Sequence, residues 1–260
     1  MGRAQNRTPS AHILPVPDPG TPLLDPRRCL VVIPARDEAP TIGQVVTGAR
    51  RVLGAPVLVV DDASRDDTAA VARAAGARVL TLPLGLGAWG ATQTGIRYAA
   101  RHGCAGVVTL DADGQHLPET LPALFAAHAR ADADVVIGTC VERLSRAKRV
   151  AWRYLRALTR LPLHDFTSGL RLYGPRAVDL LASPAASLLD YQDVGVLILL
   201  ARSGYSLVET PVPMQPRRTG HSRVFASWPV VARYMAQTTV LCLARFEAAP
   251  VHVPKASPPC

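Results

Sequence analysis

Two aspartates, Asp111 and Asp113, have the chemistry and the spacing to hold a metal ion. They follow the apolar run 107–110, which predicts a buried strand. Residues two apart on a strand point the same way, so the carboxylates would repel each other unless a cation lies between them. Hard divalent cations such as Mg²⁺ or Mn²⁺ take oxygen ligands and share them with phosphates. The pair therefore predicts a metal–diphosphate site, and the competing interpretation is a solvated acidic turn.

The residues around this pair alternate between predicted strands and predicted helices. Strands are predicted at 29–34, 56–62, 77–82, 106–111 and 133–138, and helices at 41–53, 64–75, 90–102 and 118–130. The predicted strands are apolar throughout, as in parallel sheets whose two faces are both covered. The sequence therefore predicts an α/β fold with a mostly parallel central sheet and helices on both faces.

Acidic residues follow three of these predicted strands. Asp37 and Glu38 follow the first strand, Asp61 and Asp62 the second, and the D-x-D pair the fourth. Because ligands of such sheets bind at the carboxyl ends of the strands, we expect these clusters to meet at one edge. The alternative for the second cluster is that Asp62 only caps the next helix, which a capping-box-like sequence predicts to begin near Ser64.

The segment 85–90 fits the G-x-G-x-x-G pattern of dinucleotide-binding folds, and an acidic residue follows about 20 residues later. However, the segment follows the third predicted strand rather than the first. The acidic residue, Asp111, also belongs to a D-x-D pair. We therefore interpret these glycines as a loop that packs closely over a nucleotide, or as a simple turn.

The bulk composition is that of a folded chain. With 260 residues, 48% of them hydrophobic, it can bury a sizeable core. It has no apolar run of about 18 residues, so no segment is expected to span a membrane. The Pro-rich residues 1–28 are expected to form a flexible tail without a signal peptide, and 247–260 a second tail. The five scattered cysteines predict reduced thiols and a cytoplasmic protein.

The net charge of +9 comes from the C-terminal half. Residues 143–245 hold 15 Lys and Arg against 5 Asp and Glu, and the rest of the chain holds 14 against 15. No recognition motif interleaves aromatic residues with this surplus, so nucleic acid is not an expected partner. Binding to a phosphorylated lipid or to an anionic membrane surface would explain this basic surplus. The alternative explanation is that the arginines are ordinary solvated surface residues.

Seven short motifs occur in an order that resembles family 2 glycosyltransferases. They are VVIPARDEAPTIG, VLVVDDASRDDT, LGLGAWGATQTGIRYA, LDADGQHLPE, DVVIGT, DFTSGLRLYG and VETPVPMQPRRTGHSR. The chain is most similar to the branch of dolichyl-phosphate mannose synthases and bacterial polyprenyl-phosphate sugar transferases. This resemblance implies a GT-A fold of the nucleotide-diphospho-sugar transferase type. It also implies an inverting transfer from a nucleotide-diphosphate sugar.

The resemblance also implies roles for residues at matching positions. The nucleoside-binding first loop is matched by Pro34, Ala35, Arg36 and Glu38, and the carboxylate that holds the base by Asp61. The metal and diphosphate ligands are matched by Asp111, Asp113 and Gln115. The acceptor and sugar loop is matched by the segment 165–171, with Asp165, Ser168, Gly169 and Arg171. An R-x-x-G-x-S-K/R element near the phosphates is matched by Arg217, Gly220, Ser222 and Arg223.

The chain departs from the family pattern at two positions. Asp37 stands where Asn is frequent, and Cys140 where many members have an arginine that would contact an acceptor phosphate, so that arginine is absent or replaced by Arg143. The Q-x-x-R-W pattern and the membrane segments of processive polysaccharide synthases are both missing. We therefore expect a single transfer rather than polymerisation.

The type of acceptor decides which groups the reaction needs. A hydroxyl acceptor needs a carboxylate base, for which Asp193 is the candidate at a position matching a family carboxylate near the sugar. An acid at a helix N-terminus is the alternative interpretation of Asp193. A phosphate acceptor is already ionised at pH 7 and needs cations instead. Arg217 and Arg223 could add bidentate hydrogen bonds at the phosphates, and a solvated turn is the alternative for Arg217.

Residues 224–246 have the pattern of an amphipathic helix. Trp228, Val231, Met235 and Cys242 share one stripe. Such a helix packs on the catalytic core or docks to a membrane interface or a partner. The domain prediction is therefore a catalytic domain at 29–223 followed by this helical segment.

Taken together, these observations predict a metal-dependent glycosyltransferase that uses Mg²⁺ or Mn²⁺ and a nucleotide-diphosphate sugar. Its catalytic residues are predicted to be Asp193, Asp113 and Arg217. The predicted acceptor is a polyprenyl phosphate in cell-envelope glycan or glycolipid synthesis, at the inner face of the cytoplasmic membrane, with a possible small integral membrane partner. The alternatives are transfer to a saccharide or lipid-linked hydroxyl, a nucleotidyltransferase, and a non-catalytic subunit that binds nucleotide sugars.

Overall fold

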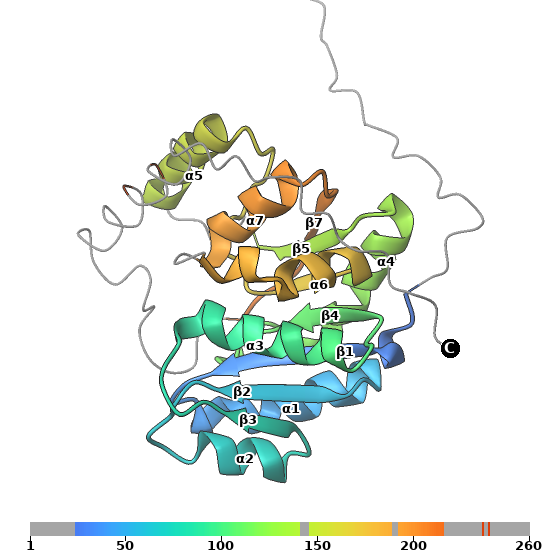
Figure 1. Ribbon diagram of the computed structural model, residues 1–260, viewed down its shortest axis with the longest axis vertical. Coiled ribbons are helices and arrows are strands. Elements are labelled where there is room, and N and C mark those ends of the chain that lie inside the picture. The colour runs from blue at the N-terminus through green and yellow to red at the C-terminus, as the bar shows by residue number, and fades with distance from the viewer. Residues whose placement is uncertain (1–23, 141–145, 189–191, 216–235, 237–238, 240–260) are drawn as a thin grey trace, which may run out of the picture.

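The computed structural model describes residues 24–140, 146–188, 192–215, 236 and 239 (Figure 1). The strands are β1 (Cys29–Ala35), β2 (Val57–Asp61), β3 (Arg78–Thr81), β4 (Gly106–Thr109), β5 (Val135–Thr139), β6 (Arg171–Tyr173) and β7 (Leu207–Pro211). The helices are α1 (Ala39–Leu53), α2 (Thr68–Ala74), α3 (Gly87–Arg101), α4 (Leu121–Ala131), α5 (Arg146–Thr159), α6 (Pro175–Ala182) and α7 (Gln192–Arg202). Short 3-10 turns are η1 (Pro26–Arg28), η2 (Pro118–Thr120) and η4 (Pro184–Leu188).

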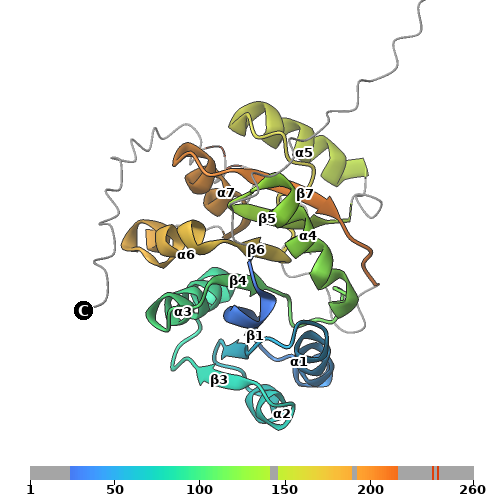
Figure 2. The same cartoon turned by 90° about the vertical axis from the view of Figure 1, so that its right-hand side faces the viewer.

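The strands form one mostly parallel sheet in the order β3-β2-β1-β4-β6-β5-β7. Only β6 runs antiparallel to its neighbours β4 and β5. Seen along the sheet, α1 and α4 cover one face and α3 and α6 the other (Figure 2). The predicted parallel sheet with helices on both faces is confirmed.

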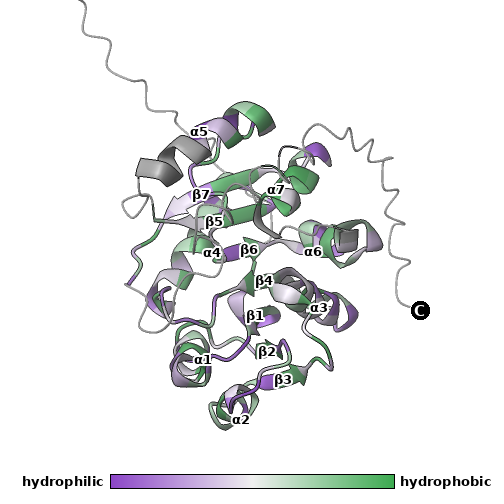
Figure 3. Ribbon diagram, turned by 90° about the vertical axis from the view of Figure 1, so that its left-hand side faces the viewer, coloured by the Kyte–Doolittle hydropathy of each residue, from purple (hydrophilic) through white to green (hydrophobic). Residues whose placement is uncertain are grey.

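Two hydrophobic clusters account for the covered faces. In β1, Leu30 and Val32 belong to the cluster beneath α3, α6 and α7, whereas Val31 and Ile33 belong to the cluster beneath α1, α2 and α4. Alternate residues of one strand thus enter opposite cores, which is why the strand is apolar throughout. In Figure 3, β5 is coloured as hydrophobic, whereas β7 at the edge of the sheet is pale or purple.

Several elements differ from the sequence prediction. The helix expected from residue 64 begins at Thr68, because the side chains ahead of it bond to a neighbouring loop, as described below. β4 ends at Thr109, so the D-x-D pair lies in the turn after the strand and not on it. Residues 24–28 were predicted as tail, yet they include η1, and Leu24 packs against the core.

The part of the chain that the structure describes contains no helix long and apolar enough to cross a membrane. Of the segment 224–246, only Ala236 and Thr239 are described, and both are helical. The Thr239 hydroxyl lies 2.8 Å from the Tyr154 hydroxyl of α5. The predicted stripe at Trp228, Val231, Met235 and Cys242 and the tails at 1–23 and 247–260 lie outside the described residues.

Candidate active site

The predicted acidic clusters meet at one edge of the sheet because β1, β2 and β4 run parallel and end together. Ala35 at the end of β1 pairs with Asp61 of β2, and Val32 of β1 pairs with Thr109 of β4. Asp37 and the D-x-D pair therefore emerge on the same side of the molecule as the end of β2. This edge is where ligands of parallel sheets bind.

Four hydrogen bonds join the loops that follow β1 and β2. They run from Asp37 N to Ser64 Oγ (3.0 Å), Glu38 N to Thr68 Oγ1 (2.8 Å), Ala39 N to Asp66 Oδ2 (3.1 Å) and Arg65 N to Asp37 Oδ1 (2.7 Å). Asp37 has a φ of 54°, the left-handed conformation that Asp and Asn adopt more readily than other side chains. Because Asp and Asn both adopt this conformation, Asp37 can occupy a position where Asn is frequent in the family.

The carboxylate of Asp66 is ionised in this loop pair at neutral pH. Partial burial raises its pKa, but hydrogen bonds from the Thr68 hydroxyl and from the Ala39 and Thr68 backbone outweigh burial and lower the pKa below 3.8. The charge thus holds the two loops in register.

The predicted nucleoside-binding residues lie together at the ends of β1 and β2. Ala35 is buried, and Pro34 and Glu38 are half-buried. Asp61 is 2% exposed and accepts a bond from Ser64 N at 3.1 Å. The Arg36 guanidinium lies 3.8 Å from the Asp62 carboxylate and is 44% exposed. Their contact with a nucleoside stays a prediction.

Asp62 does cap a helix, but not the one that follows it. Its carboxylate accepts bonds from Leu86 N at 2.6 Å and Gly87 N at 3.0 Å, at the beginning of α3. These are N–H groups that a helix leaves without internal partners. The glycine loop is therefore tied to the end of β2, where a Cβ on Gly85 would lie 2.8 Å from Arg36 Nη1.

The two carboxylates of the D-x-D pair have unlike surroundings. Asp113 is 5% exposed, and its Oδ1 accepts a bond from Gln115 N at 3.0 Å. The Asp111 side chain is 45% exposed, and its Oδ2 lies 3.5 Å from His116 Nε2. The turn thus buries one carboxylate and leaves the other open to solvent.

The segment 165–171 packs directly against this turn. Thr109 Oγ1 donates to Gly169 O at 2.7 Å, and a Cβ at residue 169 would lie 2.2 Å from Asp111 Oδ1. A larger residue here would require the Asp111 carboxylate to turn aside. The structure therefore brings the predicted metal ligand and the predicted acceptor loop into contact.

The polar residues of this segment mostly bond to the protein itself. Asp165 Oδ1 accepts bonds from Thr167, and the Ser168 hydroxyl donates to Gly138 O. Arg171 is 3% exposed and donates to the carbonyls of Ser168 (2.9 Å) and Phe166 (3.2 Å). These contacts give Ser168 and Arg171 a part in holding the loop, and direct contact with substrate stays a prediction.

Strand β7 leads from this segment towards the predicted phosphate-binding element. Glu209 accepts bonds from His164 N (2.7 Å) and Asp165 N (2.8 Å). Gln215 N then donates to Gln115 O at 2.8 Å, beside the D-x-D pair. The chain thus reaches residue 215 next to the predicted metal ligands, two positions before Arg217. Arg217, Gly220, Ser222 and Arg223 themselves lie outside the described residues, as does Arg143.

Two other positions singled out in the sequence lie on or after regular elements. Asp193 is the second residue of α7, which agrees with either interpretation of it, but its side chain is not among those described. Cys140 is half-buried with a free thiol just after β5.

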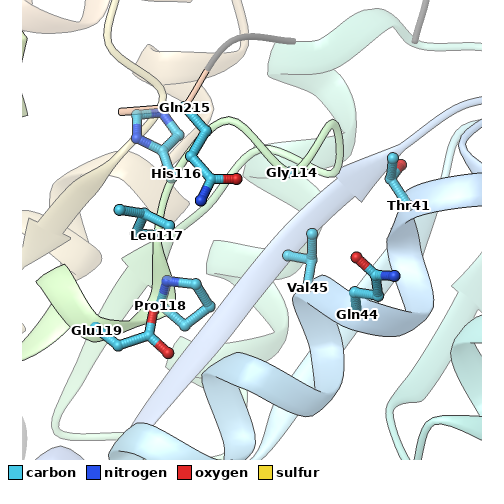
Figure 4. A pocket seen from close by; sticks show the side chains of 9 residues that line it. All are labelled: Thr41, Gln44, Val45, Gly114, His116, Leu117, Pro118, Glu119 and Gln215. Atoms are coloured by element: carbon cyan, nitrogen blue, oxygen red, sulfur yellow. The ribbon is translucent and has the colours of Figure 1, made fainter. Parts of the chain in front are cut away.

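A pocket of about 280 Å³ adjoins the site on the side of α1. Figure 4 shows Thr41, Gln44 and Val45 of α1 facing Leu117 and other residues that follow the D-x-D pair. Neither carboxylate of the pair lines this pocket. We therefore locate the reaction by the carboxylates, at the carboxyl ends of the strands, and not by this pocket.

The residues present suit a divalent cation that is shared with a substrate. Two carboxylates and the Gln115 amide offer oxygen ligands, which Mg²⁺ and Mn²⁺ prefer. Among the described residues, no group of three or more His, Cys, Asp and Glu side chains could hold a metal ion alone. Any further ligands would therefore come from elsewhere, as when a diphosphate completes the shell.

Sequence reasoning missed the residues that position the site. Asp62 was considered as a cap of the wrong helix, whereas Thr109, His116 and Glu209 were not singled out at all. No strand is predicted at 207–211, so the sequence gives no signal that would single out Glu209 of β7.

Comparison with known proteins identifies the family. The profile of glycosyl transferase family 2 matches residues 30–182. An undecaprenyl-phosphate mannosyltransferase of Micrococcus luteus is 34% identical over 216 residues, covering 76% of this chain and 87% of the relative. A polyprenol monophosphomannose synthase of Mycolicibacterium smegmatis is 30% identical over 230 residues, covering 81% and 85%.

Solved structures agree on the fold. A glucosyl-3-phosphoglycerate synthase of Mycobacterium tuberculosis, crystallised with Mn²⁺, uridine diphosphate and phosphoglyceric acid, superposes with a TM-score of 0.65 at 20% identity, covering 90% of this chain and 86% of the other. The predicted GT-A fold is confirmed, and the nucleotidyltransferase and non-catalytic alternatives are set aside. The chain belongs to glycosyl transferase family 2 and is a glycosyltransferase.

Proposed function

We propose that this glycosyltransferase moves one sugar, with inversion, from a nucleotide-diphosphate sugar to a polyprenyl phosphate. The names of the relatives in Micrococcus luteus and Mycolicibacterium smegmatis support this acceptor. The observation that carries the proposal is the contact between Gly169 and Asp111. It sets the predicted acceptor loop against the predicted diphosphate site, as a transfer between the two requires.

Each part of the edge has its own task in this reaction. The joined loops after β1 and β2 bind the nucleoside, and Asp61 holds the base. Asp111, Asp113 and Gln115 would hold Mg²⁺ or Mn²⁺, which offsets the charge that develops on the diphosphate as the sugar leaves. The segment 165–171 orients the sugar and the acceptor. Holding both reactants in line is itself a large part of such catalysis.

The acceptor determines whether a base is needed. A phosphate with a second pKa of about 6 is already ionised at neutral pH and attacks without losing a proton to the protein. It needs cations, which Arg217 and Arg223 would supply through bidentate hydrogen bonds. If the acceptor were a saccharide or lipid-linked hydroxyl, Asp193 would serve as the base.

A polyprenyl acceptor also places the enzyme at a membrane. The basic surplus in 143–245 would attract it to the anionic inner face of the cytoplasmic membrane. The segment 224–246 or a small integral membrane partner would add to this attraction. The expected state is therefore peripheral attachment.

An acceptor comparison tests the proposal. Purified enzyme is incubated with labelled nucleotide sugars and either undecaprenyl phosphate or undecaprenol, at equal concentration in the same detergent. We expect label in the lipid fraction only with the phosphate. Equal or better transfer to the alcohol, or transfer only to a soluble saccharide, would overturn the proposed acceptor in favour of a hydroxyl.

A further inference from the structure

His116 is a buried polar residue that lies against the D-x-D pair and has no role in the mechanism above. Its side chain is 2% exposed, and Nε2 lies 3.5 Å from Asp111 Oδ2. Its other ring nitrogen, Nδ1, is buried and has no hydrogen-bond partner among the residues that the structure describes. Buried polar atoms are nearly always paired, so this one requires an explanation.

The backbone fixes the position of this residue independently of Asp111. His116 forms an antiparallel bridge with Met214, and the adjacent Gln115 O accepts a bond from Gln215 N at 2.8 Å. The ring is therefore presented to the carboxylate by a paired strand segment and is not a mobile surface group.

Asp111 is also limited by Gly169. A Cβ there would lie 2.2 Å and 2.5 Å from the two carboxylate oxygens, and the glycine is held by the 2.7 Å bond from Thr109 Oγ1. The His116 ring thus lies at one oxygen of the Asp111 carboxylate, and the backbone of Gly169 lies beside it. The Asp111 side chain is 45% exposed.

We propose that His116 is a positioning residue that fixes the orientation of the Asp111 carboxylate before a divalent cation binds. This rests on the proposed function, in which Asp111 is a metal ligand. Nε2 faces Oδ2 at 3.5 Å, and the tautomer with its proton on Nε2 avoids repulsion between the ring lone pair and the carboxylate. At 3.5 Å the contact is longer than a strong hydrogen bond. The ring therefore orients the carboxylate without competing for the electron pairs that the cation needs.

Direct binding of Mn²⁺, followed by the electron paramagnetic resonance signal of the free ion, tests this role without measuring activity. We expect His116→Leu to weaken binding about 10- to 100-fold, the usual effect of removing a group that orients a metal ligand. His116→Gln, which keeps an N–H at the same distance along the side chain, restores most of the affinity. The matched control is His102→Leu at the opposite edge of the sheet, after α3, and it binds as wild type does.

Two further variants separate positioning from a general loss of structure. Asp111→Asn combined with His116→Leu should bind no more weakly than Asp111→Asn alone, because the two residues act through one carboxylate. Gly169→Ala should fold, since the three atoms nearest to its Cβ all belong to the end of the Asp111 side chain, but should weaken binding by turning the carboxylate.

The outcomes distinguish this inference from the function on which it rests. Wild-type affinity in His116→Leu would overturn the positioning role and leave the metal site standing. Equal weakening by His116→Leu in the Asp111→Asn background would overturn it too. No Mn²⁺ binding by the wild type would overturn the metal assignment itself, and the positioning role with it. If circular dichroism shows His116→Leu to be unfolded, His116→Ala is measured in its place: weaker binding supports the role and unchanged binding overturns it.

Discussion

At the scale of single residues, the acidic side chains of the edge fall into two groups. Asp62, Asp66 and Glu209 direct their oxygens to backbone N–H groups and so shape the loops. Asp111 keeps almost half of its side chain exposed. All of these are acidic residues after or within strands, so residue type alone could not separate the groups. The separation depends on which loop lies opposite each side chain, and that is a property of the folded sheet.

Arg217 is the residue whose substitution best separates acceptor from donor binding. If it holds the acceptor phosphate, Arg217→Ala raises the KM for the polyprenyl phosphate or lowers turnover, and Arg217→Lys rescues poorly because lysine lacks the planar fork. Steady-state kinetics with each substrate varied in turn give the answer. An effect confined to the KM of the nucleotide sugar would assign Arg217 to the diphosphate instead.

The buried thiol of Cys29, the first residue of β1, makes the free energy of unfolding depend on pH. Burial, together with the charges of Asp25 and Cys104, raises the pKa of its thiol from 9.0 to about 12, and Arg28 offsets part of this. The folded state thus disfavours the thiolate. The contribution of this thiol to the free energy of unfolding is fully present below the pKa that it has in the unfolded chain. It is lost as the pH rises from about 9 towards 12.

The expected result is a steeper fall in the free energy of unfolding above about pH 9 for wild type than for Cys29→Ala. Urea denaturation at a series of pH values measures both slopes. Parallel slopes would show that another group causes the alkaline loss.

At the scale of elements, the sequence predicted what apolar runs determine and missed what tertiary pairing determines. β1, β2 and β4 are continuous apolar runs that enter two cores, and their order and direction follow from the helices between them. β6 has three residues, one of them the buried Arg171, and is a strand only because it lies between β4 and β5. The beginnings of α2 and α3 depend on Asp66 and Asp62, which bond to loops distant in the sequence.

The cap on α3 is a testable case. Asp62→Ala leaves the N–H groups of Leu86 and Gly87 without their acceptor, so we expect it to lower the free energy of unfolding by about 1–2 kcal/mol. Asp67→Ala is the matched control, because Asp67 precedes α2 and makes no side-chain capping bond. Chemical denaturation of both variants measures the difference. A loss no larger for Asp62→Ala than for Asp67→Ala would contradict the cap.

At the scale of the whole molecule, the charge distribution predicts how the enzyme reaches a lipid substrate. Each basic residue near an anionic surface contributes about 1 kcal/mol within a Debye length. We expect the protein to sediment with anionic liposomes at low salt, to be released as salt rises, and to bind neutral liposomes less. A protein that ignores liposomes but binds membranes containing an integral partner would shift the attachment to that partner. Failure to bind either, with activity on a soluble acceptor, would contradict attachment and the polyprenyl acceptor together.

The most direct test of the central claim is the metal dependence of sugar transfer to undecaprenyl phosphate. We predict that excess EDTA abolishes transfer by wild type, and that Mg²⁺ or Mn²⁺ restores it. Asp113→Asn keeps a side-chain oxygen that can accept the bond from Gln115 N, so we expect it to fold. It should lose about 10²-fold or more in turnover even with added metal, the scale for removing a main electrostatic stabiliser. The exposed Asp132, at the opposite edge of the sheet, supplies the control Asp132→Asn, which should retain full activity. Full transfer by wild type in EDTA, or by Asp113→Asn, would contradict the assignment of the D-x-D pair.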